Sequence, residues 1–189
     1  MIRTAKRFCP EAQGCRAAAT LGSIGAIVST PKGLRPGAMP QSLSAVYLHL
    51  VFSTKGRLPL LADGDLRARL HSYLGAASRE LDCPPLQVGG VADHVHILAR
   101  NGRETAQAGW VKEIKRVSSR WLKTQGAAFK DFEWQGGYAV FSVSPSTLER
   151  VRAYVADQER HHRRFDYQGE LRALPRRHGL EWDERHLWD

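Results

Sequence analysis

Between Ala45 and His162, strand-like and helix-like patterns alternate in an order that few folds can accommodate. Apolar residues recur with a period of two in the predicted strands, and at three- to four-residue spacing in the predicted helices. The predicted strands span residues 45–53, 86–91, 94–99 and 137–143, and the predicted helices span residues 63–81, 104–125 and 146–162. The order β-α-β-β-α-β-α is that of a ferredoxin-like split βαβ. We therefore expect an α+β domain in which one antiparallel sheet carries helices on one face, plus a C-terminal helix.

Local signals mark where the predicted helices begin and end. The first helix is expected to end before Pro84, because proline cannot continue a helix. Ser146 and Glu149 form an S-x-x-E capping box, which predicts that the last helix starts there and runs to about His162.

The first 39 residues differ in character from the rest of the chain. They combine scattered charges with small residues, glycine and proline, and they show no sustained periodicity. We interpret residues 1–39 as a disordered or mis-annotated N-terminal extension and residues 40–189 as a single domain. Met39 stands at the change in character, so one hypothesis is that translation starts there.

Composition narrows the class of protein. The 189 residues suffice for one domain with a buried core, and no apolar run approaches the roughly 18 residues of a membrane-spanning helix. We therefore expect a soluble protein without a membrane partner. Three cysteines without paired spacing argue against a disulfide framework and favour a reducing cytoplasm.

The net charge of +9 favours a polyanionic partner, but its distribution weakens the argument. Residues 1–38 contain six basic residues and one acidic residue, whereas residues 39–189 contain 22 basic and 18 acidic residues. Charge alone is therefore weak evidence that the folded part binds nucleic acid.

The segment DHVHIL, residues 93–98, places two histidines one residue apart in an apolar run. On a strand, residues two apart point to the same face, so His94 and His96 are predicted to project side by side. Such a pair can hold one divalent metal ion. The bare spacing is a weak signal, because eight histidines in a chain of 189 residues give about 0.3 such pairs by chance. Asp93 is interpreted as a turn residue or as a group that orients a histidine.

A metal site needs a third ligand, and the last predicted helix offers a candidate. Tyr154 and Gln158 are four residues apart and are expected to share one helix face. His94, His96 and the Gln158 carbonyl oxygen would give mixed nitrogen and oxygen ligation, which suits Mg²⁺ or Mn²⁺ better than a closed zinc site. The Tyr154 phenol, one turn away, is a candidate nucleophile.

Four segments in this order resemble the single-tyrosine transposases of the HUH nuclease superfamily, the IS-two-hundred-like group that includes repeat-associated tyrosine transposases. The segments are DHVHIL, WVKEIKRVSSRW, YVADQ and the C-terminal HGLEWDERHLWD. The resemblance covers roughly residues 40–189 and is far more specific than the histidine pair alone. It implies that His94, His96 and Gln158 bind Mg²⁺ or Mn²⁺ and that Tyr154 is the catalytic nucleophile.

The resemblance also implies an activity, the cutting and rejoining of single-stranded DNA at hairpin-bearing ends. Tyr154 would attack phosphorus, retain the 5′ phosphate as a phosphotyrosine and release a 3′ hydroxyl, and a second 3′ hydroxyl would then rejoin the strands. Because a phenol has an ordinary pKa of about 10, its deprotonation needs help. His161 is one candidate base, although His161 and His162 are more simply interpreted as part of a basic, phosphate-facing helix end.

Candidate DNA contacts come from two basic segments. One follows the first predicted strand, and the other recurs at helical spacing opposite the stripe that contains Trp110 and Trp121. For the second segment, a merely solvated helix face is an equally good explanation. The candidates are Lys55, Arg57, Lys112, Lys115, Arg116, Ser119 and Lys123.

The resemblance implies further partners and leaves alternatives open. It implies hairpin-bearing single-stranded DNA as the substrate, a homodimer, and a bacterial, nucleoid-associated location. It does not fix whether the tyrosine serves its own or the partner's metal site. The alternatives are a rolling-circle-type initiator, a domesticated hairpin-processing nuclease, a non-catalytic nucleic-acid-binding regulator and a zinc hydrolase.

Overall fold

The computed structural model describes residues 43–162 and 167–181 of the chain. The extension predicted for residues 1–39 lies outside the described residues. No helix in the described ranges combines the length and the apolarity needed to cross a membrane.

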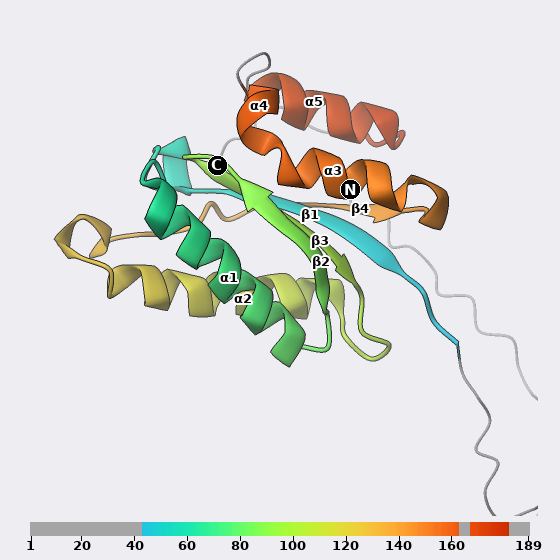
Figure 1. Ribbon diagram of the computed structural model, residues 1–189, viewed down its shortest axis with the longest axis horizontal. Helices are drawn as coiled ribbons and strands as arrows, with labels where there is room; N and C mark the ends of the chain where they lie inside the picture. Colours follow the sequence, from blue (N-terminus) through green and yellow to red (C-terminus); the bar gives the residue numbers. More distant parts are fainter. Residues whose placement is uncertain (1–42, 163–166, 182–189) are drawn as a thin grey trace, which may run out of the picture. The chain divides into compact units, whose positions relative to one another are not determined.

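Four strands form one antiparallel sheet, in the order β2-β3-β1-β4. The strands are β1 (Tyr47–Ser53), β2 (Pro85–Gly90), β3 (His94–Arg100) and β4 (Ala139–Val143). The helices are α1 (Gly64–Glu80), α2 (Gln107–Lys123), α3 (Leu148–Ala156), α4 (Gln158–His162) and α5 (Tyr167–Arg177), with short 3-10 turns at Lys55–Arg57, Ala127–Phe129 and Pro145–Thr147. This α+β architecture confirms the predicted fold class, and it places β1 and β3 at the centre of the sheet (Figure 1).

One face of the sheet packs on α1 and α2 and holds the main core. The alternating residues Leu48, Leu50 and Phe52 of β1 point into this core, as do Val95 and Ile97 of β3. Each of these side chains is at most 3% exposed. The period-two pattern of β1 predicts that alternate residues point into the core, and this prediction is confirmed. The two helices contact each other on this side of the sheet (Figure 1).

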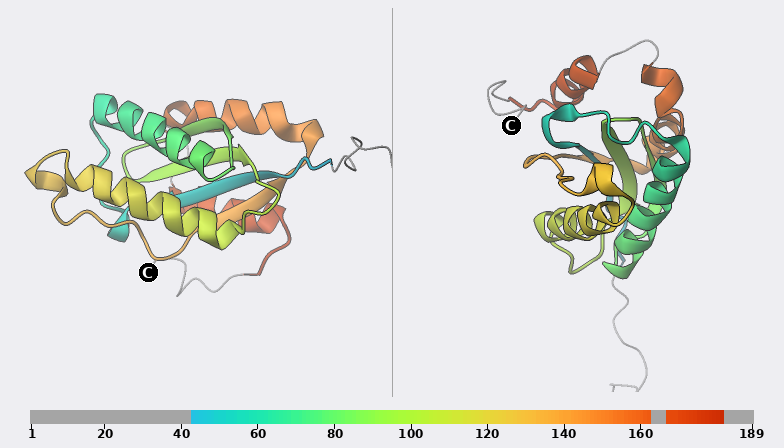
Figure 2. Two further views of the ribbon diagram at one scale, coloured as in Figure 1. Left: turned by 90° about the horizontal axis from the view of Figure 1, so that it is seen from below. Right: turned by 90° about the vertical axis from the view of Figure 1, so that its left-hand side faces the viewer.

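The other face carries α3, α4 and α5 (Figure 2). Because successive strand residues point to opposite faces, His49 and Val51 of β1 and His94 and His96 of β3 all project to this side. Val51 packs there against Phe141 of β4 and Leu174 of α5 in a second, smaller core cluster. The fold therefore buries a group of imidazoles beneath the C-terminal helices.

The prediction of one helix over residues 146–162 is wrong in two details. The helix does not begin with a capping box at Ser146, because the Ser144 side chain accepts the backbone N–H of Ser146 and a 3-10 turn precedes α3. It is also not continuous to His162, because Asp157 leaves the helical conformation at φ −108°, ψ 28° and separates α3 from α4. The break changes the direction of the chain just before Gln158 and His162.

Candidate metal centre and tyrosine site

His94 and His96 lie side by side on β3, each completely buried under the C-terminal helices. Their ring centroids are 5.0 Å apart. A third imidazole, that of His162 at the end of α4, lies with its ring centroid 4.6 Å from that of His94. One nitrogen of each of the three rings can be chosen so that all lie within 4.8 Å of one another, a spacing that one metal ion could bridge.

The carboxylate of Asp93 forms a hydrogen bond with Nδ1 of the His94 ring. Asp93 Oδ1 lies 2.7 Å from His94 Nδ1, and Arg57 contacts the other carboxylate oxygen at 3.4 Å. Burial raises the pKa of Asp93, but the hydrogen bond from His94 and the charge of Arg57 outweigh burial and lower it overall, so the group is a carboxylate. A carboxylate accepts the proton of Nδ1–H, which leaves the lone pair on Nε2 for a metal.

His49 of β1 has the corresponding relation to His96. His49 Nε2 lies 2.9 Å from His96 Nδ1, and the two rings are stacked with centroids 5.1 Å apart. Burial and the neighbouring His178 lower the pKa of His49 to about 4, so its ring is neutral and can accept the proton of His96 Nδ1–H. Both strand histidines are therefore held by Nδ1, with Nε2 as the remaining candidate ligand atom.

Gln158 supplies a buried amide at the start of α4. The residue is 1% exposed, and its Nε2 donates to the backbone carbonyl oxygen of Tyr154 at 3.2 Å. Its Oε1 is buried and accepts no hydrogen bond from the described residues. Because a buried polar atom without a partner costs about 1–3 kcal/mol, this oxygen fits a cation as its missing partner.

The residues present therefore fit the divalent ion that the sequence predicts. Three imidazoles lie close enough together to share one ion, and the buried Gln158 oxygen is a further candidate donor; mixed nitrogen and oxygen donors of this kind suit Mn²⁺ and, with more water, Mg²⁺. The position of His162 differs from the sequence-based prediction, in which His162 belongs to a basic, phosphate-facing helix end. The turn at Asp157 directs its ring to His94 instead.

Tyr154 lies on α3 above the same imidazoles. Its ring meets those of His96 and His49 edge to face, with centroids 5.9 and 6.0 Å apart, and that of His161 with centroids 5.1 Å apart. Tyr154 is half-buried and lines an open cavity of about 730 Å³, so its phenol can be reached from outside. Within the chain, the ring of Tyr154 therefore lies against imidazoles of the candidate metal centre.

Gly89 explains how α3 comes so close to the sheet. It lies on β2 opposite His96, and a Cβ there would overlap the carbonyl oxygen of Val155 and lie 2.9 Å from its carbonyl carbon. The backbones of β2 and α3 are therefore in direct contact, which only glycine permits. The sequence offers Gly89-Gly90 within a strand as a signal of close backbone approach, and this signal is absent from our sequence-based prediction.

Most of the predicted DNA-contact residues of α2 share one surface groove. Lys112, Lys115, Ser119 and Lys123 line a cavity of about 470 Å³ together with Trp134 and Tyr138. Lys115 is partly buried and donates to the backbone carbonyl oxygens of residues 135, 136 and 137. These hydrogen bonds hold residues 135–137 against α2. Lys112 and Lys123 are exposed.

The other three predicted DNA-contact residues form ion pairs within the chain. Arg116 lies outside the groove lining and pairs with Glu113 on its own helix. Lys55 pairs with Glu133, and Arg57 pairs with Asp93 beside the histidine cluster. The structure therefore does not bring Arg116, Lys55 or Arg57 into the α2 groove.

Replacing Asp93 by asparagine should weaken metal binding by about 10- to 100-fold, the usual effect of losing a group that orients a ligand. An amide holds the Nδ1 proton less strongly than a carboxylate, so His94 is no longer fixed with its Nε2 lone pair available. Calorimetric titration of the metal-free protein with Mn²⁺ measures the change. The control is Asp63→Asn, at the exposed N-cap of α1, which should leave the affinity unchanged. An Asp93→Asn affinity equal to that of the wild type would contradict this role.

Comparison with known proteins identifies the family of the chain. The family model described as "Transposase IS200 like" matches residues 42–158, more than half of the chain. A candidate transposase from Deinococcus radiodurans R1 is 20% identical, with 62% of this chain and 94% of that chain covered and a TM-score of 0.50, which shows a shared fold. A REP-associated tyrosine transposase bound to a REP hairpin is 12% identical, with 76% and 74% covered and a TM-score of 0.45. No curated protein matches the chain. The match over residues 42–158 shows that the chain belongs to the IS200-like transposase family.

Proposed function

We propose that this transposase cuts and rejoins single-stranded DNA through a covalent 5′-phosphotyrosine on Tyr154. The observation that carries the proposal is the position of the Tyr154 ring, edge-on to His96 and reachable from an open cavity. A phenol over a cluster of buried imidazoles is the pairing that the proposed chemistry requires: a nucleophile beside a charge-stabilising centre.

The metal set proposed is His94, His96 and Gln158, with His162 as a further ligand. A bound Mg²⁺ or Mn²⁺ would polarise the scissile phosphate and stabilise the charge that develops on it. The protein's part is to position these groups: Asp93 and His49 fix the two strand imidazoles, and the break at Asp157 directs His162 to them. The Tyr154 oxygen loses its proton and forms a bond to phosphorus, the bond from phosphorus to the 3′ oxygen breaks, and the 3′ oxygen takes up a proton and leaves as a hydroxyl, so the proton balance is zero.

The substrate proposed is DNA with a hairpin next to the cleaved single strand. The groove on α2 that carries Lys112 and Lys123 supports a contact to the DNA backbone away from the cleavage site, because both ammonium groups are exposed there. We place this activity in one single-tyrosine HUH domain, residues 40–189, acting as a homodimer. The choice of a hairpin follows the resemblance of the four sequence segments to repeat-associated tyrosine transposases.

The main alternative is a non-catalytic nucleic-acid-binding regulator with the same fold. A single assay separates the two functions. The full chain is incubated with labelled single-stranded oligonucleotides that carry a hairpin, with Mg²⁺ or Mn²⁺ and in parallel with EDTA, and the products are separated by denaturing electrophoresis. We expect a covalent protein–DNA adduct that needs the metal. Tight DNA binding without any adduct, over a library of flanking sequences, would favour the regulator.

A further inference from the structure

The cavity that Tyr154 lines extends well beyond the histidine cluster. It has a volume of about 730 Å³, within the range of small-molecule binding sites. Tyr154 and His49 stand at its inner side, and β4, the start of α3 and the last turn of α5 form the rest of its wall. The proposed ligands His94, His96, Gln158 and His162 are not among its lining residues, so most of this space is not part of the metal centre.

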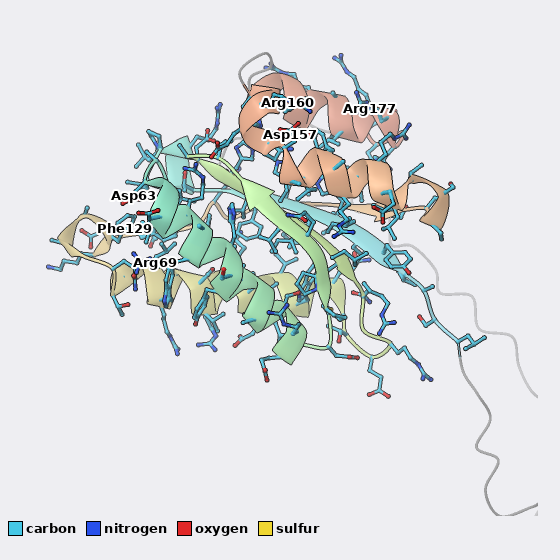
Figure 3. All side chains as sticks on the ribbon, viewed as in Figure 1. Asp63, Arg69, Phe129, Asp157, Arg160 and Arg177 are labelled. Atoms are coloured by element: carbon cyan, nitrogen blue, oxygen red, sulfur yellow. The ribbon has the colours of Figure 1, made fainter. Side chains whose placement is uncertain are left out.

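The charged groups of the cavity all favour an anion. Arg150 of α3 and Arg177 of α5 line it, both exposed, and His178 lies at the end of α5. None of the described lining residues carries a carboxylate. Figure 3 shows Arg177 on α5. Arg177 lines the same cavity as Tyr154, so its guanidinium shares this space with the candidate nucleophile.

The rest of the lining suits a nucleobase. His178 is exposed and stacks on the buried Phe141 of β4, with ring centroids 4.6 Å apart and an angle of 21° between the rings. The exposed face of an aromatic ring held in this way is a platform on which a base can stack. Hydroxyl groups of Ser142, Ser144 and Thr147 add hydrogen-bond partners along the same wall.

We propose that this cavity binds the nucleotide next to the scissile phosphate, with its phosphate between Arg150 and Arg177 and its base stacked on His178. The inference rests on the proposed function, because it takes the cleaved phosphate to lie at Tyr154. It adds a binding site that holds the strand in line with the phenol. Stacking and phosphate contacts do not depend on base identity, so this site positions the strand and does not select its sequence.

Paired arginine substitutions test the phosphate contact. In a Tyr154→Phe background, where no adduct can form, the affinity for fluorescein-labelled oligothymidylate is measured by fluorescence anisotropy over a range of salt concentrations. Arg150→Gln with Arg177→Gln should lower the affinity by about tenfold or more at about 0.1 M salt, and should reduce the salt slope by about 0.7, the value for one single-strand phosphate. The matched control is Arg152→Gln with Arg176→Gln, which removes equal charge from the same helices outside the cavity lining. Equal losses in the two pairs overturn the proposal.

A second comparison tests the base platform. His178→Ala should lower the preference for oligothymidylate over an abasic oligonucleotide of equal length by about fivefold or more, the effect of losing one stacked base. His178→Phe keeps an aromatic ring on Phe141 and should retain the preference. An unchanged preference in His178→Ala overturns the base platform, and thermal unfolding checks that α5 stays folded in both variants.

The outcomes separate this inference from the proposed function. Selective loss of binding in the Arg150 and Arg177 pair supports the cavity even if the wild type forms no adduct, a result that would remove only the cleavage proposal. Adduct formation by the wild type with equal losses in both arginine pairs keeps the cleavage proposal and removes the cavity. Absence of any oligothymidylate binding overturns the cavity proposal.

Discussion

The Tyr154→Phe variant is expected to form no covalent adduct with DNA, with a fall in cleavage rate of at least about 10⁴-fold. The substitution removes only the phenolic oxygen. The ring contacts with His49, His96 and His161 remain, so α3 should keep its place and the imidazole cluster its geometry. DNA affinity should stay within about twofold of the wild type, because a single hydroxyl contributes little to a binding surface dominated by phosphate contacts. The labelled-hairpin assay measures the adduct, and fluorescence anisotropy measures the affinity.

Tyr73→Phe provides the matched control for this experiment. Tyr73 lies on α1, stacked on Trp121 on the other side of the sheet, and its hydroxyl has no place in the proposed chemistry. That variant should cut at the wild-type rate. Full adduct formation by Tyr154→Phe would mean that another side chain is the nucleophile, and the mechanism would then have to be abandoned.

The fold could be predicted from the sequence because each strand and helix carries its own periodicity. β1 alternates Leu48, Leu50 and Phe52 toward the core, and the spacing of Leu66, Leu70 and Leu74 places the buried face of α1. The final helix was less predictable. Its break at Asp157 is a local change of backbone conformation that leaves helical spacing in the sequence intact, so periodicity alone favours one continuous helix.

Some residues of the candidate site could likewise be predicted from the sequence, and others could not. His94 and His96 could be paired because residues two apart on a strand share a face. The spacing of Tyr154 and Gln158 predicts one shared helix face, but the break at Asp157 puts the two residues on different helices. His49 could not be linked to His96 from the sequence. Its contact crosses from β1 to β3 and depends on the register that aligns His49 with Leu98, so it exists only in the folded sheet. His162 depends in turn on the break before α4.

Basic residues were the least predictable part of the site. Helical spacing groups Lys115 and Arg116 with the other α2 candidates, but it does not predict which groups their charged ends contact. In the fold, Lys115 reaches over the ring of Phe52 to three backbone carbonyl oxygens, and Arg116 turns back to Glu113. Arg150 and Arg177, which line the cavity beside Tyr154, have no distinguishing pattern in the sequence.

Gly89→Ala is expected to lower the cleavage rate by about 100-fold or more while the protein stays folded. The added Cβ would lie 2.9 Å from the carbonyl carbon of Val155, whereas unbonded carbon atoms rest at about 3.5–4.0 Å. The same Cβ would overlap the carbonyl oxygen of Val155, so the α3 backbone must move away from β2 by more than about 1 Å, and a displacement of about 1 Å at a catalytic group already costs about 100-fold in rate. Tyr154 immediately precedes Val155, so the phenol moves with this backbone relative to the imidazoles.

Stability measurements separate this effect from simple unfolding. The steric conflict should lower the free energy of unfolding by about 1–3 kcal/mol, which leaves most molecules folded at 25 °C if the wild type has ordinary stability. Gly109→Ala on α2 is the matched control, because a Cβ there meets nothing within 4 Å and the rate should be unchanged. Mn²⁺ affinity adds a second readout: His94 and His96 sit on the sheet and should still bind the ion, whereas Gln158 moves with α3 and α4, so the affinity should fall without being lost. If Gly89→Ala cleaves DNA as fast as the wild type, the close contact between β2 and α3 does not position the tyrosine, and Gly89 has no part in catalysis.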